Sequence, residues 1–236
     1  MLDSRTGYPQ RARLTSRGDV LVNRAHYRDR AAAGRAVLDS LGHYQSEPDL
    51  LVIGLARGGV PVAAQVAAGL GAELDVSVVR KLGLPGHEEL ALGAISGEHM
   101  VLNNSLVRSQ GVSAEALDAV IERERRELAR REVVYRGGRP RADAAGRTVI
   151  LVDDGLATGA TMHVATLDAR AGGAGRTVVA VPTAPTVARS EFASLADEFV
   201  CPYTPAPFIA VGMSYRCFAQ VDDEEVCDLL ARFSRH

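Results

Sequence analysis

Two adjacent acids, Asp153 and Asp154, follow an apolar run at residues 148–152 and precede a turn of small residues. The run predicts a buried strand that delivers both carboxylates to the carboxyl edge of a sheet, where ligands bind in α/β proteins. Carboxylates only accept hydrogen bonds, so the pair suits sugar hydroxyl groups or a magnesium ion. Adjacent acids repel each other unless something cationic binds there, which argues against an ordinary surface pair.

The turn after the two acids is suited to an anion. Its residues are Gly155, Leu156, Ala157, Thr158, Gly159, Ala160 and Thr161. The N–H groups of such a turn and of the first helical turn have no intrahelical partner, and the helix dipole is positive there. They can therefore surround one phosphate, with hydroxyl donors from Thr158 and Thr161 and close backbone approach at Gly159. A sugar with a terminal phosphate and free ring hydroxyls would use both halves of the motif.

Residues 149–161 resemble the phosphoribosyl diphosphate (PRPP) signature of type I phosphoribosyltransferases, with four hydrophobic residues, two acids and a Thr-Gly-x-Thr turn. The resemblance implies that Asp153 and Asp154 hold the 2- and 3-hydroxyls of ribose. It also implies that they hold Mg²⁺, directly or through water, and that residues 157–161 wrap the 5-phosphate. The implied fold is α/β, with a central, mostly parallel sheet flanked by helices, a small hood and a mobile lid.

Basic residues are expected beside two other strands. They are Arg57, with Gly58 and Gly59, after residues 50–55, and Arg80 and Lys81 at the end of residues 74–80. The resemblance implies that the first turn grips diphosphate, often with a strained or cis peptide, and that the second pair meets diphosphate or neighbouring phosphates. The guanidinium fork of Arg57 matches paired phosphate oxygens. A plain βα turn and a solvated strand end are the alternatives.

Residues 81–98 are rich in Gly and acidic side chains, and we expect a long loop there, with a short hairpin at 93–102. The resemblance places a mobile lid at about 82–112, which would close over the reacting centre. Residues 81–95 also resemble a lesser-known bacterial group of phosphoribosyltransferases, and that likeness runs roughly from 29 to 230. Lid candidates for substrate or metal contact are His87, Glu88 and Glu89, although each could be solvated or structural.

Strands alternating with helices predict a parallel sheet with right-handed crossovers. We expect strands at 50–55, 74–80, 148–152, 177–182 and 198–200, and helices at 31–41, 61–70, 113–134, 159–171, 187–195 and 222–233. The charged run 122–127 predicts a solvated helix face with pairs such as Glu122 and Arg126. The lid would be followed by a helical insertion at about 113–135.

The hood would come from the N-terminal part and from about 202–220. Its aromatic residues could stack a flat ring, or could be ordinary core and rim. They are Tyr203, Phe208, Tyr215 and Phe218.

The composition limits the classes of protein. A net charge of −2, from 27 basic and 29 acidic side chains, argues against nucleic-acid binding. The 236 residues suit one phosphoribosyltransferase domain at 21–236 after a flexible basic tail at 1–20. The apolar runs are too short to span a bilayer, and the basic start does not resemble a secretory signal. We expect a cytoplasmic enzyme with small-molecule partners, with a homodimer as one option.

The resemblance implies transfer of a phosphoribosyl group from PRPP to a nitrogenous acceptor, with release of diphosphate. The residues predicted to carry catalysis are Asp153, Asp154, Arg57 and Lys81, with Mg²⁺ as the cofactor. In 6-oxopurine enzymes the residue before the Thr-Gly is an Asp that serves the purine, and its replacement by Ala157 argues against that role. The alternatives are a catalytically silent PRPP-binding regulator and a phosphatase or phosphorylase that uses the same anion site.

Overall fold

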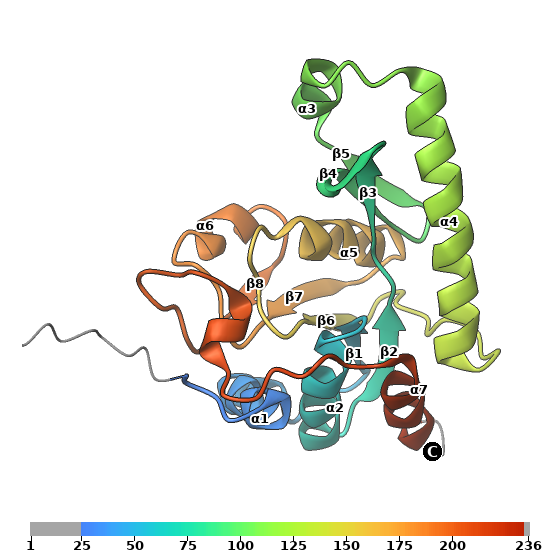
Figure 1. Cartoon of the computed structure of the whole chain (residues 1–236). Coiled ribbons are helices and arrows are strands. Elements are labelled where there is room, and N and C mark those ends of the chain that lie inside the picture. Colours follow the sequence, from blue (N-terminus) through green and yellow to red (C-terminus); the bar gives the residue numbers. More distant parts are fainter. Residues whose placement is uncertain (1–24, 234–236) are drawn as a thin grey trace, which may run out of the picture.

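The computed structural model describes residues 25–233, except for the side chains of Glu88 and Glu89. The predicted basic tail at 1–20 lies outside this range. A five-stranded parallel sheet forms the centre, and a three-stranded antiparallel sheet stands above it (Figure 1). In spatial order the parallel strands are β2 (Glu73–Ser77), β1 (Leu50–Leu55), β6 (Thr148–Val152), β7 (Arg176–Ala180) and β8 (Glu198–Val200). The antiparallel strands are β3 (Arg80–Leu84), β4 (His87–Ser96) and β5 (His99–Leu102).

Helices cover both faces of the parallel sheet. They are α1 (Arg30–Ser40), α2 (Gly59–Leu70), α3 (Asn104–Ser109), α4 (Ala114–Arg136), α5 (Ala160–Ala171), α6 (Ala188–Phe192) and α7 (Asp223–Arg232). Short 3-10 turns lie at Gly42–Tyr44 and Val211–Ser214. In Figure 1, α1, α2 and α7 lie below the sheet and α5 and α6 lie above it, while α4 runs beside both sheets. The chain is therefore a three-layer α/β fold, as the alternation of strands and helices predicts.

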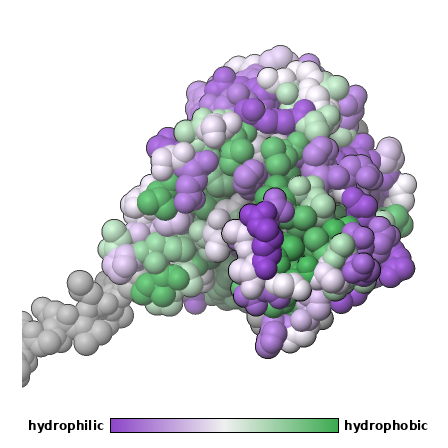
Figure 2. Space-filling model, turned by 90° about the horizontal axis from the view of Figure 1, so that it is seen from above, coloured by the Kyte–Doolittle hydropathy of each residue, from purple (hydrophilic) through white to green (hydrophobic). Residues whose placement is uncertain are grey.

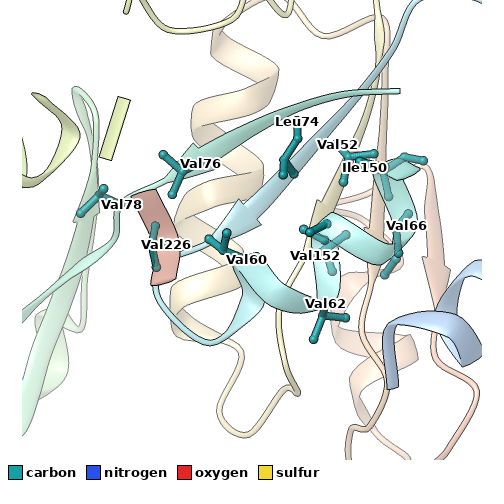
Figure 3. Close-up of a cluster of buried hydrophobic side chains, with 14 of the residues drawn as sticks. Val52, Val60, Val62, Val66, Leu74, Val76, Val78, Ile150, Val152 and Val226 are labelled. Carbon is teal, nitrogen blue, oxygen red and sulfur yellow. The ribbon is translucent and has the colours of Figure 1, made fainter. Parts of the chain in front are cut away.

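The central strands are buried on both faces because each face is covered by helices. All residues of β1 are buried, and successive side chains point to opposite sides. Val52 joins the lower core with Ile150 and Val152, and α2 adds Val60 and Val66 (Figure 3). Neighbouring residues of the same strands join a second core under α5 and α6. The predicted strands at 50–55, 148–152 and 198–200 are confirmed.

Local signals set the ends of the helices. The Asp29 carboxylate accepts a hydrogen bond from the Ala32 N–H at 2.8 Å, and α1 begins at the next residue. Ser113 caps α4 in the same way, through the Ala116 N–H at 3.2 Å. Gly71 ends α2 with a φ of 66°, a left-handed conformation that favours glycine. These three boundaries confirm the predicted ones.

The segment after β2 differs from the prediction. The second strand ends at Ser77, so Arg80 begins β3 in the antiparallel sheet and does not end the parallel strand. The expected long loop at 81–98 is also wrong, because β3 and β4 pair there, whereas the hairpin at 93–102 is confirmed by β4 and β5. The reason is burial: Leu82, Leu92 and Ile95 enter the core, although Gly and charged residues separate them in the sequence.

The charged run on α4 is not wholly solvated. Glu124 is only 6% exposed, because its Oε2 accepts bonds from Arg80 Nη2 at 2.6 Å and Arg80 Nε at 2.9 Å. Its Oε1 accepts a bond from Arg123 Nε at 2.9 Å. Glu122 lies 3.8 Å from Arg125, not beside the predicted Arg126. The prediction of a solvated face is therefore wrong at Glu124, which fastens α4 to β3.

Two buried acids hold the antiparallel sheet and its flanking helix in place. Asp168 on α5 is 3.2 Å from His99 Nδ1 on β5 and accepts a 2.6 Å bond from Arg141 Nη2. Asp75 on β2 accepts a 3.0 Å bond from Arg136 Nε on α4. Because Asp168 belongs to the helix that follows the two adjacent acids, the antiparallel sheet is linked directly to the candidate site.

Candidate active site

Strand β6 delivers Asp153 and Asp154 to the carboxyl edge of the parallel sheet, next to the start of α5. A cavity of about 130 Å³ opens there. It is lined by Lys81, Asp153, Gly155, Leu156, Ala157, Thr158, Gly159, Thr161 and Met162. The predicted phosphate turn, except for Ala160, therefore lines the same small cavity as one acid, Asp153, and one cation, Lys81. Ala160, the remaining turn residue, is the first residue of α5.

The turn is held in shape by close packing. The Leu156 N–H donates to the Thr183 carbonyl at 2.8 Å, which fixes the start of the turn. Gly159 has a φ of 73°, and an added Cβ would lie 3.1 Å from the Phe192 ring. Ala160 and Thr161 open α5, so their N–H groups have no intrahelical acceptor. The positive end of the helix and these N–H donors favour an anion in the cavity.

Asp153 and Asp154 lie in different surroundings. Asp153 lines the 130 Å³ cavity at the turn after β6, the phosphate-loop cavity. Its Oδ1 accepts a hydrogen bond from the Asp154 N–H at 2.8 Å. Burial raises the pKa of Asp153 well above its ordinary value, and the nearby Asp154 charge raises it further. Burial also raises the pKa of Asp154, although the Arg30 guanidinium opposes that rise. A ligand that donates hydrogen bonds or brings positive charge would favour the ionised pair.

Arg30 belongs to the site although the sequence analysis did not single it out. Its Nε and Nη2 lie 2.9 and 2.8 Å from Asp154 Oδ2, and its side chain is 13% exposed. Its Nη1 donates to the Ala219 carbonyl at 2.6 Å, and its guanidinium lies 4.1 Å from the centre of the Phe218 ring. One signal was available, because a cation in the first turn of a helix opposes the dipole and needs another partner.

The turn after β1 packs directly on the two acids. An added Cβ on Gly58 would lie 2.0 Å from Asp154 Oδ2, and one on Gly59 would lie 2.6 Å from the Val152 carbonyl. Only glycine therefore allows this approach. The Ala56–Arg57 peptide bond is cis, in agreement with the expectation for this turn.

A second cavity, of about 340 Å³, lies on the Asp154 side of the acid pair. It is lined by Arg30, Arg57, Gly58, Asp154, Phe218, Ala219, Gln220 and Val221. Arg57 Nη1 is 3.6 Å from Asp223 Oδ1, and the same oxygen accepts the Tyr135 hydroxyl at 2.7 Å. The cavity thus has two guanidinium groups, one paired with Asp154 and one loosely paired with Asp223, whose remaining N–H groups could donate to an anion.

The predicted basic pair divides between two places. Lys81 reaches the phosphate-loop cavity from β3, whereas Arg80 binds Glu124 on α4. A role for Arg80 in phosphate binding stays a prediction, and this ion pair does not support it. His87 is exposed at the start of β4, and the side chains of Glu88 and Glu89 lie outside the described part of the structure.

The aromatic residues of the predicted hood have different environments. Tyr215 is 5% exposed and its hydroxyl donates to the Asp154 carbonyl, so its ring is packed and not free to stack on a substrate. Tyr203 stacks on His26 with centroids 4.1 Å apart. Phe208 is half-buried, and Phe218 is 40% exposed. Phe218 is therefore the aromatic residue that lines a cavity of the site, while a substrate contact by Phe208 stays a prediction.

The face seen from above has a hydrophilic rim, and its hydrophobic residues gather towards the middle (Figure 2).

Over residues 25–233 with described side chains, no group of three or more His, Cys, Asp or Glu side chains is placed to hold a metal. Among the helices described, none combines the length and the apolar character that a membrane crossing requires.

Comparison with known proteins gives the family. The family described as "Phosphoribosyl transferase domain" matches residues 27–181. Proteins from two strains of Mycobacterium tuberculosis, provisionally named as phosphoribosyl transferases, are 48% identical over 208 residues. The match covers 88% of this chain and 47% of each relative, so the chain spans about half the length of those proteins.

A solved structure agrees with the sequence comparison. The crystal structure of TT1426 from Thermus thermophilus is 41% identical and superimposes with a TM-score of 0.74, covering 88% of this chain and 99% of that one. The parallel sheet, the acid pair and the phosphate loop define a type I phosphoribosyltransferase fold. The chain belongs to the type I phosphoribosyltransferase family.

Proposed function

We propose that the protein transfers a phosphoribosyl group from PRPP to a nitrogenous acceptor and releases diphosphate. The observation that carries the proposal is the arrangement at the end of β6. There Asp153 shares a cavity with Lys81 and the glycine-bearing turn, and Asp154 lines the adjoining side with Arg57. One side suits a terminal phosphate, and the other suits a diphosphate.

The phosphoribosyl group would be held from its two ends. The N–H groups of residues 157–161 and the Thr158 and Thr161 hydroxyls would surround the 5-phosphate. The Asp153 and Asp154 carboxylates would accept hydrogen bonds from the 2- and 3-hydroxyls. Holding both ends fixes the anomeric carbon between the two cavities, and such positioning is a large part of catalysis in transfer reactions.

The reaction needs no covalent intermediate on the protein. The bond from the anomeric carbon to the diphosphate oxygen breaks, and its electron pair leaves with diphosphate. The lone pair of the acceptor nitrogen forms the new bond, and any proton on that nitrogen is released afterwards. The transition state would resemble an oxocarbenium ion, as in glycoside chemistry. Arg57 would stabilise the charge on the departing diphosphate, whereas Lys81 lines the cavity assigned to the 5-phosphate, and its contact with diphosphate stays a prediction.

Magnesium fits the acids as a shared ion and not as one held by the protein alone. Magnesium keeps several waters and is often bound by one or two carboxylates together with substrate phosphates. Asp153 is the better placed carboxylate, because Asp154 already bonds Arg30. When bound, the ion would supply positive charge to the diphosphate oxygens. The ion and its ligands are part of this proposal.

The antiparallel sheet would act as the lid. Its first strand brings Lys81 to the phosphate loop, and its last strand is fastened to α5 through Asp168. A cover in this position would keep water from a cation-like sugar, which would otherwise hydrolyse. Ala157 offers no acid for a 6-oxopurine acceptor. A cytoplasmic location and a dimer stay predictions.

Calorimetric titration of the protein with PRPP, in the presence of magnesium, tests the binding step. Asp153→Asn with Asp154→Asn should weaken PRPP binding at least about a hundredfold, because two charge-assisted bonds to ribose are lost. Exposed adjacent acids on α7 give a matched control, Glu224→Gln with Glu225→Gln, which removes the same charge and should bind normally. Asp153→Asn alone keeps the Arg30 contact to Asp154 and tests the site with less disturbance. Normal PRPP affinity in both Asp variants would refute the ribose assignment.

A screen of nitrogenous acceptors tests the transfer step. Diphosphate release that depends on one acceptor class supports the enzyme. Tight PRPP binding with no release across the screen would instead support a regulator that binds PRPP without catalysis.

A further inference from the structure

Arg30 has no role in the signature that defines the site, yet it is the side chain most closely bound to one of the two acids. Its guanidinium contacts Asp154 through two nitrogens at 2.9 and 2.8 Å. The Ala219 carbonyl and the Phe218 ring hold it from other directions. A side chain held by three neighbours is fixed in position, so its charge is available at the cavity without further ordering.

The place of this charge suits the leaving group. Arg30 and Arg57 line the same cavity of about 340 Å³, together with the glycine turn after β1. An added Cβ on Gly58 would lie 3.3 Å from Arg30 Nη2, so the guanidinium lies next to the turn. Arg30 is paired with Asp154 and Arg57 more loosely with Asp223, at 3.6 Å, so the cavity offers an anion two guanidinium groups with further N–H donors, and paired phosphate oxygens match a guanidinium fork.

Arg30 also reduces the electrostatic repulsion between the two acids and a bound diphosphate. Asp153 and Asp154 would repel a diphosphate held nearby, since all of these groups are anionic. The Arg30 contact neutralises Asp154 while leaving it able to accept a sugar hydroxyl, because a carboxylate has about four acceptor positions. The bonds described at Arg30 use three of its five N–H groups.

The geometry points to Arg30 as a diphosphate-binding residue, which acts together with Arg57. This inference rests on the proposed function, because it assigns one part of PRPP to one cavity. The two acids then have separate roles, since Asp153 belongs to the phosphate-loop side and Asp154 is joined to the diphosphate side through Arg30.

The test compares the binding of two fragments of the substrate, inorganic diphosphate and ribose 5-phosphate. Each fragment is titrated into the protein in the presence of magnesium, and calorimetry gives its affinity. Arg30→Gln should weaken diphosphate binding about tenfold to a hundredfold, because one charge-assisted contact is lost. Its effect on ribose 5-phosphate should be under about threefold, since Asp154 keeps its acceptor atoms. Arg30→Lys keeps the charge without the fork and should fall between wild type and Arg30→Gln for diphosphate. Arg35→Gln, exposed on the same helix, is the control and should bind both fragments normally.

The outcomes separate this inference from the proposed function. If the wild type binds both fragments and Arg30→Gln binds diphosphate normally, the inference is overturned and the proposed function stands. An equal loss for both fragments would also overturn it, because Arg30 would then only position Asp154. If the wild type binds neither fragment nor PRPP, the proposed function fails and takes this inference with it. Should Arg30→Gln fail to fold, the same comparison is made with Arg30→Lys, and a loss confined to diphosphate supports the assignment.

Discussion

Replacing Gly159 with alanine tests whether the backbone of the phosphate loop makes the anion site. Gly159 has a φ of 73°, and an added Cβ would lie 3.1 Å from the Phe192 ring. A residue with a side chain pays about 1–2 kcal/mol in this left-handed conformation, before any cost from the ring. The loop must therefore either keep its shape at that cost or rotate and misplace the N–H groups of the first turn of α5.

A second glycine gives a matched control. Gly137 has a φ of 57° at the end of α4, and an added Cβ there would meet nothing within 4 Å. Gly137→Ala should lower the free energy of unfolding by about 1 kcal/mol, and Gly159→Ala should lower it by somewhat more. Only Gly159→Ala should weaken ribose 5-phosphate binding, by about tenfold, which corresponds to one lost charge-assisted hydrogen bond.

Urea unfolding gives the stabilities of both variants, and calorimetry with ribose 5-phosphate gives the affinities. Wild-type affinity in Gly159→Ala would refute the argument, because the loop would then not depend on this backbone angle. Equal weakening in Gly137→Ala would refute it as well, since the effect would then follow from general destabilisation.

Three further predictions follow from charge and burial. Because burial and the Asp154 charge raise the pKa of Asp153, while sugar hydroxyls and a cation favour its ionised form, PRPP binding should release protons near that raised pKa. The proton release should fade as the pH rises well above the raised pKa of Asp153, and the affinity for PRPP should drop as the pH falls. Calorimetry in buffers of different ionisation heat measures the proton release and the affinity. Proton release that stays constant across this pH range would contradict the assignment. Asp75→Asn removes the buried charge partner of Arg136, which keeps Glu132 at 3.3 Å, and should cost up to about 3–5 kcal/mol in urea unfolding, whereas Glu127→Gln at a partly exposed pair should cost at most about 1 kcal/mol. A similar cost for the two variants would show that Asp75 is not effectively buried. Chelating magnesium should weaken PRPP binding more than ribose 5-phosphate binding, because the diphosphate brings most of the charge, and an equal loss in calorimetry would argue against a shared ion.

The centre of the fold could be predicted because its signals are local. The runs that form β1 and β6 are apolar throughout, since both faces of each strand are covered, and their predicted bounds are those of the structure. The candidate phosphate loop could be predicted for a related reason, because the two acids, the turn and the start of α5 are contiguous in the chain. Single capping residues, such as Asp29 and Ser113, were enough to predict where α1 and α4 begin.

The missed features depend on contacts between distant residues. Arg30 and Asp154 are 124 positions apart, and Arg80 and Glu124 are 44 apart, so no window of sequence contains either pair. The pairing of β3 with β4 was mistaken for a loop because glycines and charged residues interrupt the alternation of the buried leucines. The predicted hood is also drawn from separate segments, which is why the contacts of single aromatic residues such as Tyr215 could not be predicted from the sequence.

The most direct test of the central claim is a crystal structure of the protein with ribose 5-phosphate bound. The account predicts the phosphate within about 3 Å of N–H groups at residues 157–161, with ring hydroxyls donating to Asp153 and Asp154. A phosphate bound instead between Arg30 and Arg57, with both acids free of the sugar, would contradict it.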